Sequence, residues 1–411
     1  MGMTGKIAIV GCGPAGIMSA INFARRGIAT TVIEANGDPS TAPSYNPDRS
    51  YAIDVTGHGL NAISYIDAVS EFDRDLIPFK GIDAGKGGIH PWNEPGWIGS
   101  RGDIMRVLMK IVAEKYAGLV AFRFNSPVVA IDFDSGSLTY DSDSAGQATD
   151  TYDLIVAADG GGSIIRASAE KNAANFTLTH RDASYFCKMI ALDKAVGQLD
   201  ETQLHVLSLK YPCVAGAING PGGKDDPIWF CQVPFSSRKA FRDTEEARSF
   251  LRKNNPRILD LASEQAIETF SKCESQNIGR STMTSRCNAG KVVFIGDACA
   301  SYPPIGQGAN AALESAMILD QSITAICQNG QDVSDNIPQI AEHFDAQWGA
   351  EARAVSWAAN KFKFTNKWHI IRVQIAAKLN CNVVEETKSS TMSYSDARKH
   401  ARKVWPLWAI S

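Results

Sequence analysis

The stretch Gly11-Cys12-Gly13-Pro14-Ala15-Gly16 constrains the fold more than any other part of the sequence, because of what flanks it. Residues 6–10 (KIAIV) predict a short buried strand, whereas the Ala-rich pattern over 14–26, closed by Gly27, predicts a helix. A second strand, TTVIEA, follows and ends at Ala35. Residues 6–35 thus form a compact βαβ unit, which indicates an α/β fold.

A pyrophosphate-binding turn is the function that this unit predicts. Glycines at the strand–helix turn let the backbone approach a pyrophosphate, which the free N–H groups and dipole of the helix N-terminus attract. Glu34 lies 18 residues after Gly16, near the roughly 20 expected for a carboxylate that binds ribose hydroxyls. Rather than a chance glycine-rich turn, we predict a dinucleotide site with these residues: Gly11, Gly13, Ala15, Gly16, Glu34 and Ala35.

Length and composition exclude several classes of protein. The 411 residues suit two domains, or one large α/β domain with an insert, and a net charge of −3 without a basic cluster argues against nucleic acid as a partner. Nine cysteines without a C-x-x-C pair fit neither a disulfide framework nor a metal site, which favours a reducing, cytoplasmic setting. No signal peptide and no apolar run of about 18 residues is present, so no membrane span is predicted. For the short apolar stretch WHIIRVQIAAKL we favour a core or partner-packing helix over a membrane-surface helix.

The pattern of elements changes twice along the chain. From about Ala183, the segments SYFCKMIAL, QLHVLSL, CVAGAI and PIWFCQVPF predict antiparallel strands, with GPGGKDD as one turn. The α/β pattern returns at Gly290 with KVVFIGDA. We predict a discontinuous cofactor domain (1–75, 98–180 and 275–340), a β-rich substrate domain (76–97 and 181–274) and a C-terminal helical region (341–411).

Three motifs in this order resemble the class A flavoprotein monooxygenases, which are aromatic hydroxylases. The glycine-rich turn is followed by D-G-x-x-S-x-x-R at 159–166, after the strand DLIVAA. A G-D pair at 296–297 then precedes P-P-x-G-x-G-x-N at 303–310, which we call the flavin loop. The resemblance implies a glutathione-reductase-type, Rossmann-like FAD-binding domain with an inserted antiparallel β-sheet substrate domain.

The residues of the flavin loop suit a flavin ring. Its backbone N–H groups, at the N-terminus of a helix predicted to run to Leu319, would face the negative charge of the reduced ring. Glycines allow close approach, the two prolines stiffen the loop, and no acidic side chain opens the helix. A helix start that only needs a tight turn is the alternative. The loop residues concerned are Pro304, Gly306, Gln307, Gly308, Ala309 and Asn310, with Pro304 and Gly306 predicted to take part in catalysis.

The resemblance also assigns cofactor contacts outside the loop. It implies that Asp297 binds the ribityl chain and that Asp159 belongs to the cofactor site. Arg101, at the start of a predicted amphipathic helix over 101–116, would reach phosphate or ribityl oxygens, unless it is simply solvated. Arg49 is a weaker candidate of the same kind, and Val129 would contact the adenine through its backbone or be a core valine.

Within this family, the kynurenine 3-monooxygenase-like group is most similar. Residues 48–63 resemble its R-S-I-N-L-A-L segment, and residues 389–397 resemble its tail. That group holds an amino-acid carboxylate with an arginine just before the helix that starts at Arg101. Here the segment reads PFKGIDAGKGG and offers only Lys80 and Lys86, so the sequence leaves the substrate open.

Candidate groups for the chemistry follow from position and type. Asp54 and His58 lie on a segment expected to approach the ring, where they would transfer protons or orient substrate, or be satisfied structural residues. Cys12 and Cys299 are expected to be small packing residues, so FAD would be bound noncovalently. An aromatic substrate pocket, or alternatively the core, would contain Trp92, Trp97, Phe230 and Gln232.

The resemblance implies one leading reaction, and it leaves other functions open. NAD(P)H would reduce FAD, O₂ would add to give a C4a-hydroperoxide, and an activated aromatic or similarly electron-rich small molecule would take the distal oxygen. The alternatives are a related flavoprotein reductase, a halogenase (whose G-W-x-W-x-I-P signature GWIGS does not match) or a non-catalytic nucleotide-binding protein. The sequence does not define the oligomeric state.

Overall fold

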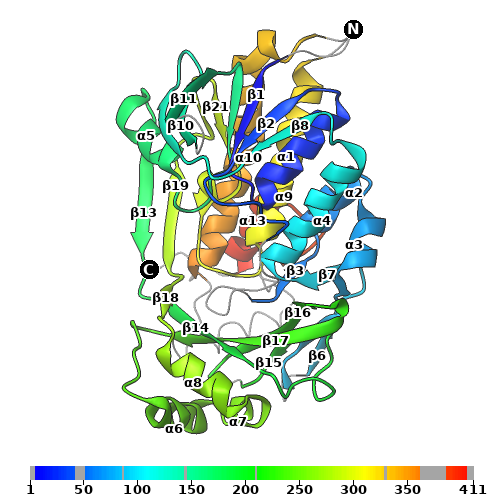
Figure 1. Cartoon of the computed structure of the whole chain (residues 1–411), viewed down its shortest axis with the longest axis vertical. Helices are drawn as coiled ribbons and strands as arrows, with labels where there is room; N and C mark the ends of the chain where they lie inside the picture. The colour runs from blue at the N-terminus through cyan, green and yellow to red at the C-terminus, as the bar shows by residue number, and fades with distance from the viewer. Residues whose placement is uncertain are drawn as a thin grey trace.

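A computed structural model describes residues 5–41, 51–85, 88–142, 146–208, 211–327, 331–361 and 386–404. One part of the molecule is built on a six-stranded sheet in the order β20-β21-β12-β1-β2-β8 (Figure 1). Five neighbouring strands are parallel, and β20 is antiparallel to β21. The strands are β1 (Ile7–Val10), β2 (Thr30–Ile33), β8 (Val120–Arg123), β12 (Leu154–Ala157), β20 (Asn288–Ala289) and β21 (Val292–Phe294).

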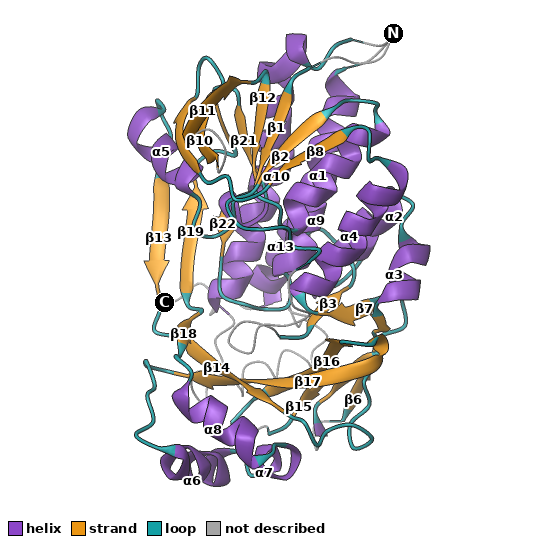
Figure 2. Cartoon of the chain, in the orientation of Figure 1, coloured by secondary structure: helices purple, strands orange, loops and turns teal. Residues whose placement is uncertain are grey.

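This sheet is covered on both sides, which explains why its central strands are apolar throughout. Every residue of β1, β12 and β21 is buried, as expected for parallel strands between two layers. Figure 2 shows helices on one side and a small antiparallel sheet on the other. The helices are α1 (Pro14–Arg25), α4 (Arg101–Lys115) and α9 (Gly308–Ile326), and the small sheet contains β9 (Val128–Asp132), β10 (Ser137–Ser142) and β11 (Gly146–Thr151).

A seven-stranded sheet forms the second part, in the order β18-β14-β17-β16-β15-β5-β6 (Figure 1). Helices α6 (Thr244–Asn254), α7 (Arg257–Leu261) and α8 (Glu264–Lys272) cover its outer face (Figure 2). Trp229, Cys231 and Val233 alternate along β17 and join the apolar core beneath these helices. The strands are β5 (Gly81–Asp83), β6 (Ile89–Pro91), β14 (Phe186–Ala191), β15 (Gln203–Val206), β16 (Val214–Gly220), β17 (Gly223–Phe235) and β18 (Gln276–Asn277).

The predicted antiparallel strands are confirmed, with two differences. β16 reaches Gly220 and β17 begins at Gly223, so most of GPGGKDD belongs to strands and only residues 221–222 make the turn. β5 pairs with β15 in parallel, with Ile82 opposite Leu204, which the alternation of side chains could not reveal. This pairing joins β5 and β6 of segment 76–97 to the strands of segment 181–274 in one sheet, and the division into domains stays a prediction.

Smaller elements connect the two parts. β3 (Ile53–Val55), β7 (Trp97–Gly99) and β4 (Ile77–Pro78) form one short sheet, and β13 (Leu178–Asp182), β19 (Arg280–Thr284) and β22 (Ala300–Ser301) form another. The remaining helices are α2 (His58–Tyr65), α3 (Val69–Asp75), α5 (Ile164–Asn172), α10 (Ile337–Lys361) and α13 (Tyr394–Val404). Within the described ranges, no helix has the length and apolar character needed to cross a membrane. The stretch WHIIRVQIAAKL lies outside those ranges.

Candidate functional site

Predicted cofactor residues follow the carboxyl ends of four neighbouring parallel strands. Gly11 follows β1, Glu34 follows β2, and Asp159 lies two residues after β12. Asp297 lies three residues after β21, inside a short 3₁₀ helix (Gly296–Ala298). The carboxyl ends of parallel strands meet at one edge of a sheet, and in open α/β sheets ligands bind at that edge. The structure therefore brings these four residues to one binding edge.

The glycine-rich turn has the geometry that a dinucleotide site requires. Gly11 has φ +102°, and a Cβ placed on it would lie 2.4 Å from the carbonyl oxygen of Ala158. A Cβ on Gly16 would lie 2.0 Å from the carbonyl oxygen of Gly11, so α1 packs on β1 only with glycine there. Pro14 occupies the first turn of α1, no acidic residue is present in that turn, and Ala15 is buried beneath it. The N-terminus of α1 is thus a cradle for an anion.

Arg101 adds a positive charge to this cradle. It is the first residue of α4, whose start is fixed by a capping box between Ser100 and Asp103. A Cβ on Gly13 would lie 3.0 Å from Nη2 of Arg101, so the guanidinium lies over the glycine-rich turn. Its charge also acts on Asp297, where it counteracts the rise in pKa caused by burial. Arg101 therefore lies over the glycine-rich turn with its charge acting on Asp297, and its contact with a phosphate stays a prediction.

Glu34 is held at the turn by backbone donors. Its Oε2 accepts a hydrogen bond from Cys12 N at 2.7 Å, and its Oε1 accepts from Asn36 N at 2.9 Å and from Asn36 Nδ2 at 2.7 Å. The next residue, Ala35, is exposed. This carboxylate is part of the turn, which is where a ribose ligand is needed.

Replacing Glu34 with glutamine should lower the affinity for FAD by about one to two decades, because charge-assisted hydrogen bonds to ribose hydroxyls contribute roughly 1.5–3 kcal/mol. FAD titration of the apoprotein measures the change. Asp38→Asn serves as the control, because it removes a nearby acidic charge whose Oδ1 accepts a local hydrogen bond from Ser40 N. Equal affinities for Glu34→Gln and the parent would exclude Glu34 as the ribose ligand.

Arg166 joins two of the motifs through backbone contacts. Its Nη1 donates to the carbonyl oxygens of Asp297 (2.7 Å) and Ala298 (3.0 Å), and its Nη2 donates to that of Gly161 (2.5 Å). Ser163 caps α5 by accepting from Arg166 N at 2.9 Å. The D-G-x-x-S-x-x-R motif therefore fixes the position of the 296–298 turn.

Asp159 is partly exposed and Asp297 is exposed, yet the protein surrounding each carboxyl group raises its pKa. Burial raises the pKa of Asp159, whose Oδ2 accepts from Ile165 N at 3.3 Å while its Oδ1 has no hydrogen-bond partner among the described residues. Burial also raises the pKa of Asp297, against the opposing charges of Arg101 and Arg166. Asp297 itself is exposed, so a ligand can reach it.

The flavin loop has the backbone that was predicted for it. Gly306 has φ +78°, and α9 begins at Gly308 with no acidic residue in its first turn. A Cβ on Gly308 would meet no atom within 4 Å, and Pro304 and Gly308 are exposed. The helix ends at Ile326 rather than Leu319, because the apolar pattern continues for two more turns.

Asn310 and Gln307 hold the flavin loop in place with their side chains. Asn310 Nδ2 donates to the carbonyl oxygens of Gly306 and Asp54, both at 3.0 Å, and its Oδ1 accepts from Thr56 N at 3.1 Å. Gln307 is fully buried and its Oε1 accepts from the hydroxyl of Tyr394 at 3.1 Å. For these two residues, and for Ala309, backbone N–H groups remain the proposed contacts with a flavin.

The structure brings Asp54 and His58 to the flavin loop, each with a partner that the sequence did not suggest. Asp54 forms a buried ion pair with Lys388, and Nδ1 of His58 lies 2.7 Å from Oε1 of Glu314 on α9. Tyr394 stacks on His58 with ring centroids 3.9 Å apart. These partners escaped prediction because they lie more than 250 residues away in sequence and carry no motif.

The predicted substrate residues separate into two groups. Phe230 and Gln232 lie on the face of β17 opposite the helix-covered core, where Phe230 packs with Met189 and Ile218. We call Met189, Val214, Ile218, Phe230 and Gln232 the inner face of the seven-stranded sheet. Trp97 corrects our expectation, because it is buried in the core of the first part and donates from Nε1 to Asp73 at 2.8 Å. Trp92 packs on Phe79, with ring centroids 6.0 Å apart, beside the outer core.

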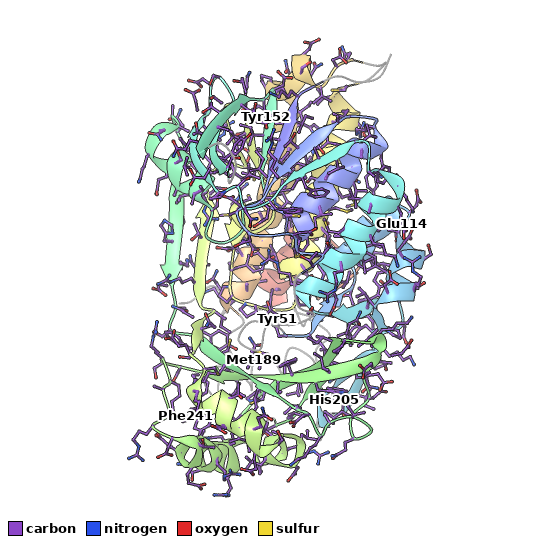
Figure 3. The ribbon with its side chains drawn as sticks, viewed as in Figure 1. Tyr51, Glu114, Tyr152, Met189, His205 and Phe241 are labelled. Atoms are coloured by element: carbon purple, nitrogen blue, oxygen red, sulfur yellow. The ribbon has the colours of Figure 1, made fainter. Side chains whose placement is uncertain are left out.

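Tyr51 lies between the two large sheets (Figure 3) and is 39% exposed. Burial raises the pKa of its hydroxyl, with further contributions from Asp297 and Cys187. Cys187 lies on β14, two residues from Met189. Figure 3 shows Tyr51 and Met189 between the two large sheets. Tyr51, which lies in the segment 48–63 but was not among the predicted site residues, is therefore a further candidate for the substrate pocket.

The remaining predicted residues are placed as follows. Val129 is 46% exposed on β9, so it is not a core valine, and its contact with an adenine stays a prediction.

Burial raises the pKa of the Cys12 thiol to about 12, and Cys299 is fully buried with its Sγ 3.2 Å from that of Cys287, which supports packing roles for both. Arg49 and Lys86 lie outside the described residues.

Comparison with known proteins agrees with this site. Residues 101–336, more than half of the chain, match the family model described as "FAD binding domain", and residues 5–188 match "Pyridine nucleotide-disulphide oxidoreductase". The chain therefore belongs to the FAD-binding family of flavoproteins, and its class is that of the FAD-dependent aromatic monooxygenases that use NAD(P)H.

Two relatives of the chain carry the same enzyme name. Kynurenine 3-monooxygenase of Cryptococcus neoformans is 26% identical over 76% of this chain and 68% of its own length. The enzyme of the same name from Salinispora tropica is 26% identical over 78% of this chain and 73% of its own length.

Solved structures show the same fold. 2-Methyl-3-hydroxypyridine-5-carboxylic acid oxygenase has a TM-score of 0.64, with 16% identity over 97% of this chain and 96% of that one. HpxO of Klebsiella pneumoniae, solved with FAD and uric acid, has a TM-score of 0.63, with 18% identity over 97% of this chain and 94% of that one.

Proposed function

We propose that this enzyme hydroxylates a small, electron-rich aromatic compound held between the flavin loop and the inner face of the seven-stranded sheet. The observation that carries the proposal is the meeting of the glycine-rich turn, Glu34, Asp297 and the flavin loop at one edge of the parallel sheet, with the inner face opposite. Tyr51 supports this placement, because its hydroxyl is influenced both by Asp297 and by Cys187 of β14.

The residues present fit a noncovalently bound FAD. The N-terminus of α1, Gly13 and Arg101 would hold the pyrophosphate, since a Cβ at Gly13 would already crowd the guanidinium. Glu34 would bind the ribose and Asp297 the ribityl chain, while backbone N–H groups of 306–310 would face the ring. When bound, FAD supplies the electron transfer and the activation of O₂.

The protein's own part in the reaction is to bind, orient and exclude water. The N–H groups at the start of α9 would stabilise negative charge near the ring, and no acidic side chain in that first turn opposes them. Asp54 and His58 are both engaged with buried partners, so we propose that they position the loop rather than transfer protons. We also propose the cytoplasm as the compartment, because nine cysteines without a C-x-x-C pair do not fit a disulfide framework.

The inner face favours an aromatic substrate with a hydroxyl or amino group. Met189, Ile218 and Phe230 offer apolar contact, whereas Gln232 and the hydroxyl of Tyr51 offer hydrogen bonds. Lys80 directly precedes β5, and its charge acts on Asp200. We therefore do not expect Lys80 to replace an arginine on the inner face. We therefore propose a substrate that does not depend on recognition of a carboxylate.

A substrate screen tests this proposal. Compounds named in the related proteins (kynurenine, uric acid and 2-methyl-3-hydroxypyridine-5-carboxylic acid) and carboxylate-free phenols and anilines are mixed with the FAD-loaded enzyme and NAD(P)H without oxygen. A substrate should accelerate flavin bleaching by about tenfold or more, and isotopically labelled O₂ should then place one labelled atom in the product. Gln232→Leu should lower the response to the best compound. Rapid bleaching without any aromatic compound, and no label in any product, would favour a reductase instead.

A further inference from the structure

A buried ion pair lies directly beside the flavin loop. Nζ of Lys388 donates to Oδ2 of Asp54, and these side chains are only 8% and 2% exposed. Thr56 Oγ1 donates to the same carboxylate oxygen at 3.1 Å. A buried charge that loses its partner is strongly unfavourable, so each member of this pair requires the other.

The pair sets the position of Gly306. A Cβ placed on Gly306 would lie 3.2 Å from Oδ1 of Asp54 and 3.5 Å from Nζ of Lys388. The backbone of Asp54 is tied to the loop as well, because Asn310 Nδ2 donates to the carbonyl oxygens of both Asp54 and Gly306. Both charges therefore contact the residue whose amide we place next to the flavin ring.

Contacts that do not involve this charge hold Lys388 in place. A Cβ on Gly57 would lie 2.0 Å from the carbonyl oxygen of Lys388, so the two backbones touch. Asn61 Nδ2 donates to the carbonyl oxygen of Ser390 at 2.7 Å. Further along, the hydroxyl of Tyr394 donates to Gln307 Oε1, inside the flavin loop. The backbone of the 386–394 segment should therefore persist when the ammonium is removed.

We propose that Lys388 is a positioning residue for the flavin loop, whose ammonium neutralises Asp54 so that the amide of Gly306 meets the reduced flavin without an opposing charge. The inference rests on the proposed function, in which this loop binds the ring. A reduced flavin is anionic, and an unpaired carboxylate at this distance would oppose reduction. The other ionisable groups around the pair are His58 with Glu314, and Tyr394.

The test compares charge variants at equal FAD occupancy. Lys388→Met should lower the reduction potential of bound FAD, so that reduced flavin binds about tenfold more weakly relative to oxidised flavin, a shift of about 30 mV. Adding Asp54→Asn to Lys388→Met should restore the parent potential at every pH.

Controls separate charge from loss of structure. Lys399→Met removes an exposed ammonium that pairs with Asp396 on the same C-terminal segment, and it should leave the potential unchanged. If Lys388→Met alone folds poorly, the reduction potential of bound FAD is compared between the Asp54→Asn/Lys388→Met double variant and Lys388→Arg. This comparison still tests the charge, because the first variant removes both charges and the second keeps both. A potential in Lys388→Met equal to the parent at every pH, or a double variant that stays low, would overturn the proposal. A parent protein that does not bind FAD would instead contradict the proposed function.

Discussion

Replacing Gly306 with valine is expected to lower NAD(P)H-driven hydroxylation by about 10²-fold or more, the scale of losing one donor to a developing negative charge. Gly306 has φ +78°, a region that a β-branched residue rarely adopts. Its Cβ would also lie 3.2 Å from Oδ1 of Asp54, where the buried ion pair leaves little freedom to move. The loop amides should therefore move away from the ring, and the reduction potential of the flavin should fall.

Gly308→Ala is the matched control for this substitution, because its Cβ would meet no atom within 4 Å. FAD should remain bound in both variants, since the α1 turn, Glu34 and Asp297 are unchanged. Potential and turnover are compared with the parent at equal FAD occupancy. Unchanged values in Gly306→Val would show that the loop only connects β22 with α9.

Replacing Arg166 with methionine should destabilise the apoprotein by about 3 kcal/mol or more. Its buried guanidinium donates to three carbonyl oxygens, of which that of Ala298 is buried and the other two are partly buried, and a buried acceptor left without a donor costs roughly 1–3 kcal/mol. FAD affinity should fall by more than about 100-fold, because the 296–298 turn would no longer be fixed against Gly161. Urea unfolding and FAD titration measure the two effects.

Two further variants define what Arg166 contributes. Arg166→Lys should recover only part of either loss, because one ammonium cannot match the planar set of donors that reaches both turns. Arg181→Met, at an exposed position on β13, should change neither property. If Arg166→Met retained the parent's stability and FAD affinity, the two motifs would be independent of each other.

Local features were the most predictable from the sequence. Gly11, Gly16 and Gly306 were expected where the backbone needs a glycine, and each has a positive φ or no room for a Cβ. The start of α4 at Arg101 was also expected, and the capping box explains it. Such features depend on a few residues that are adjacent in the chain, so a sequence pattern alone can predict them.

Long-range contacts were less predictable. Lys388 looked like one residue of a polar tail, yet it is buried and paired with Asp54. Trp97 looked like a candidate for an aromatic pocket, but the alternation of a three-residue strand was too short to assign its face. Val129 is exposed for a similar reason, since its strand lies in a small sheet with one open face. In each case the outcome depends on a partner surface that the local pattern does not contain.

The Asp54–Lys388 pair can form only late in the synthesis of the chain. The two residues are separated by 334 positions, which a ribosome adding about 5–20 residues per second needs roughly 20–70 s to complete. The turn between β1 and α1, by contrast, is formed by residues that emerge together. A growing chain can therefore complete the cradle for the pyrophosphate once Arg101 and Ala158, which lie against the glycine-rich turn, have emerged, whereas the support of the flavin loop is complete only after residue 388 has emerged.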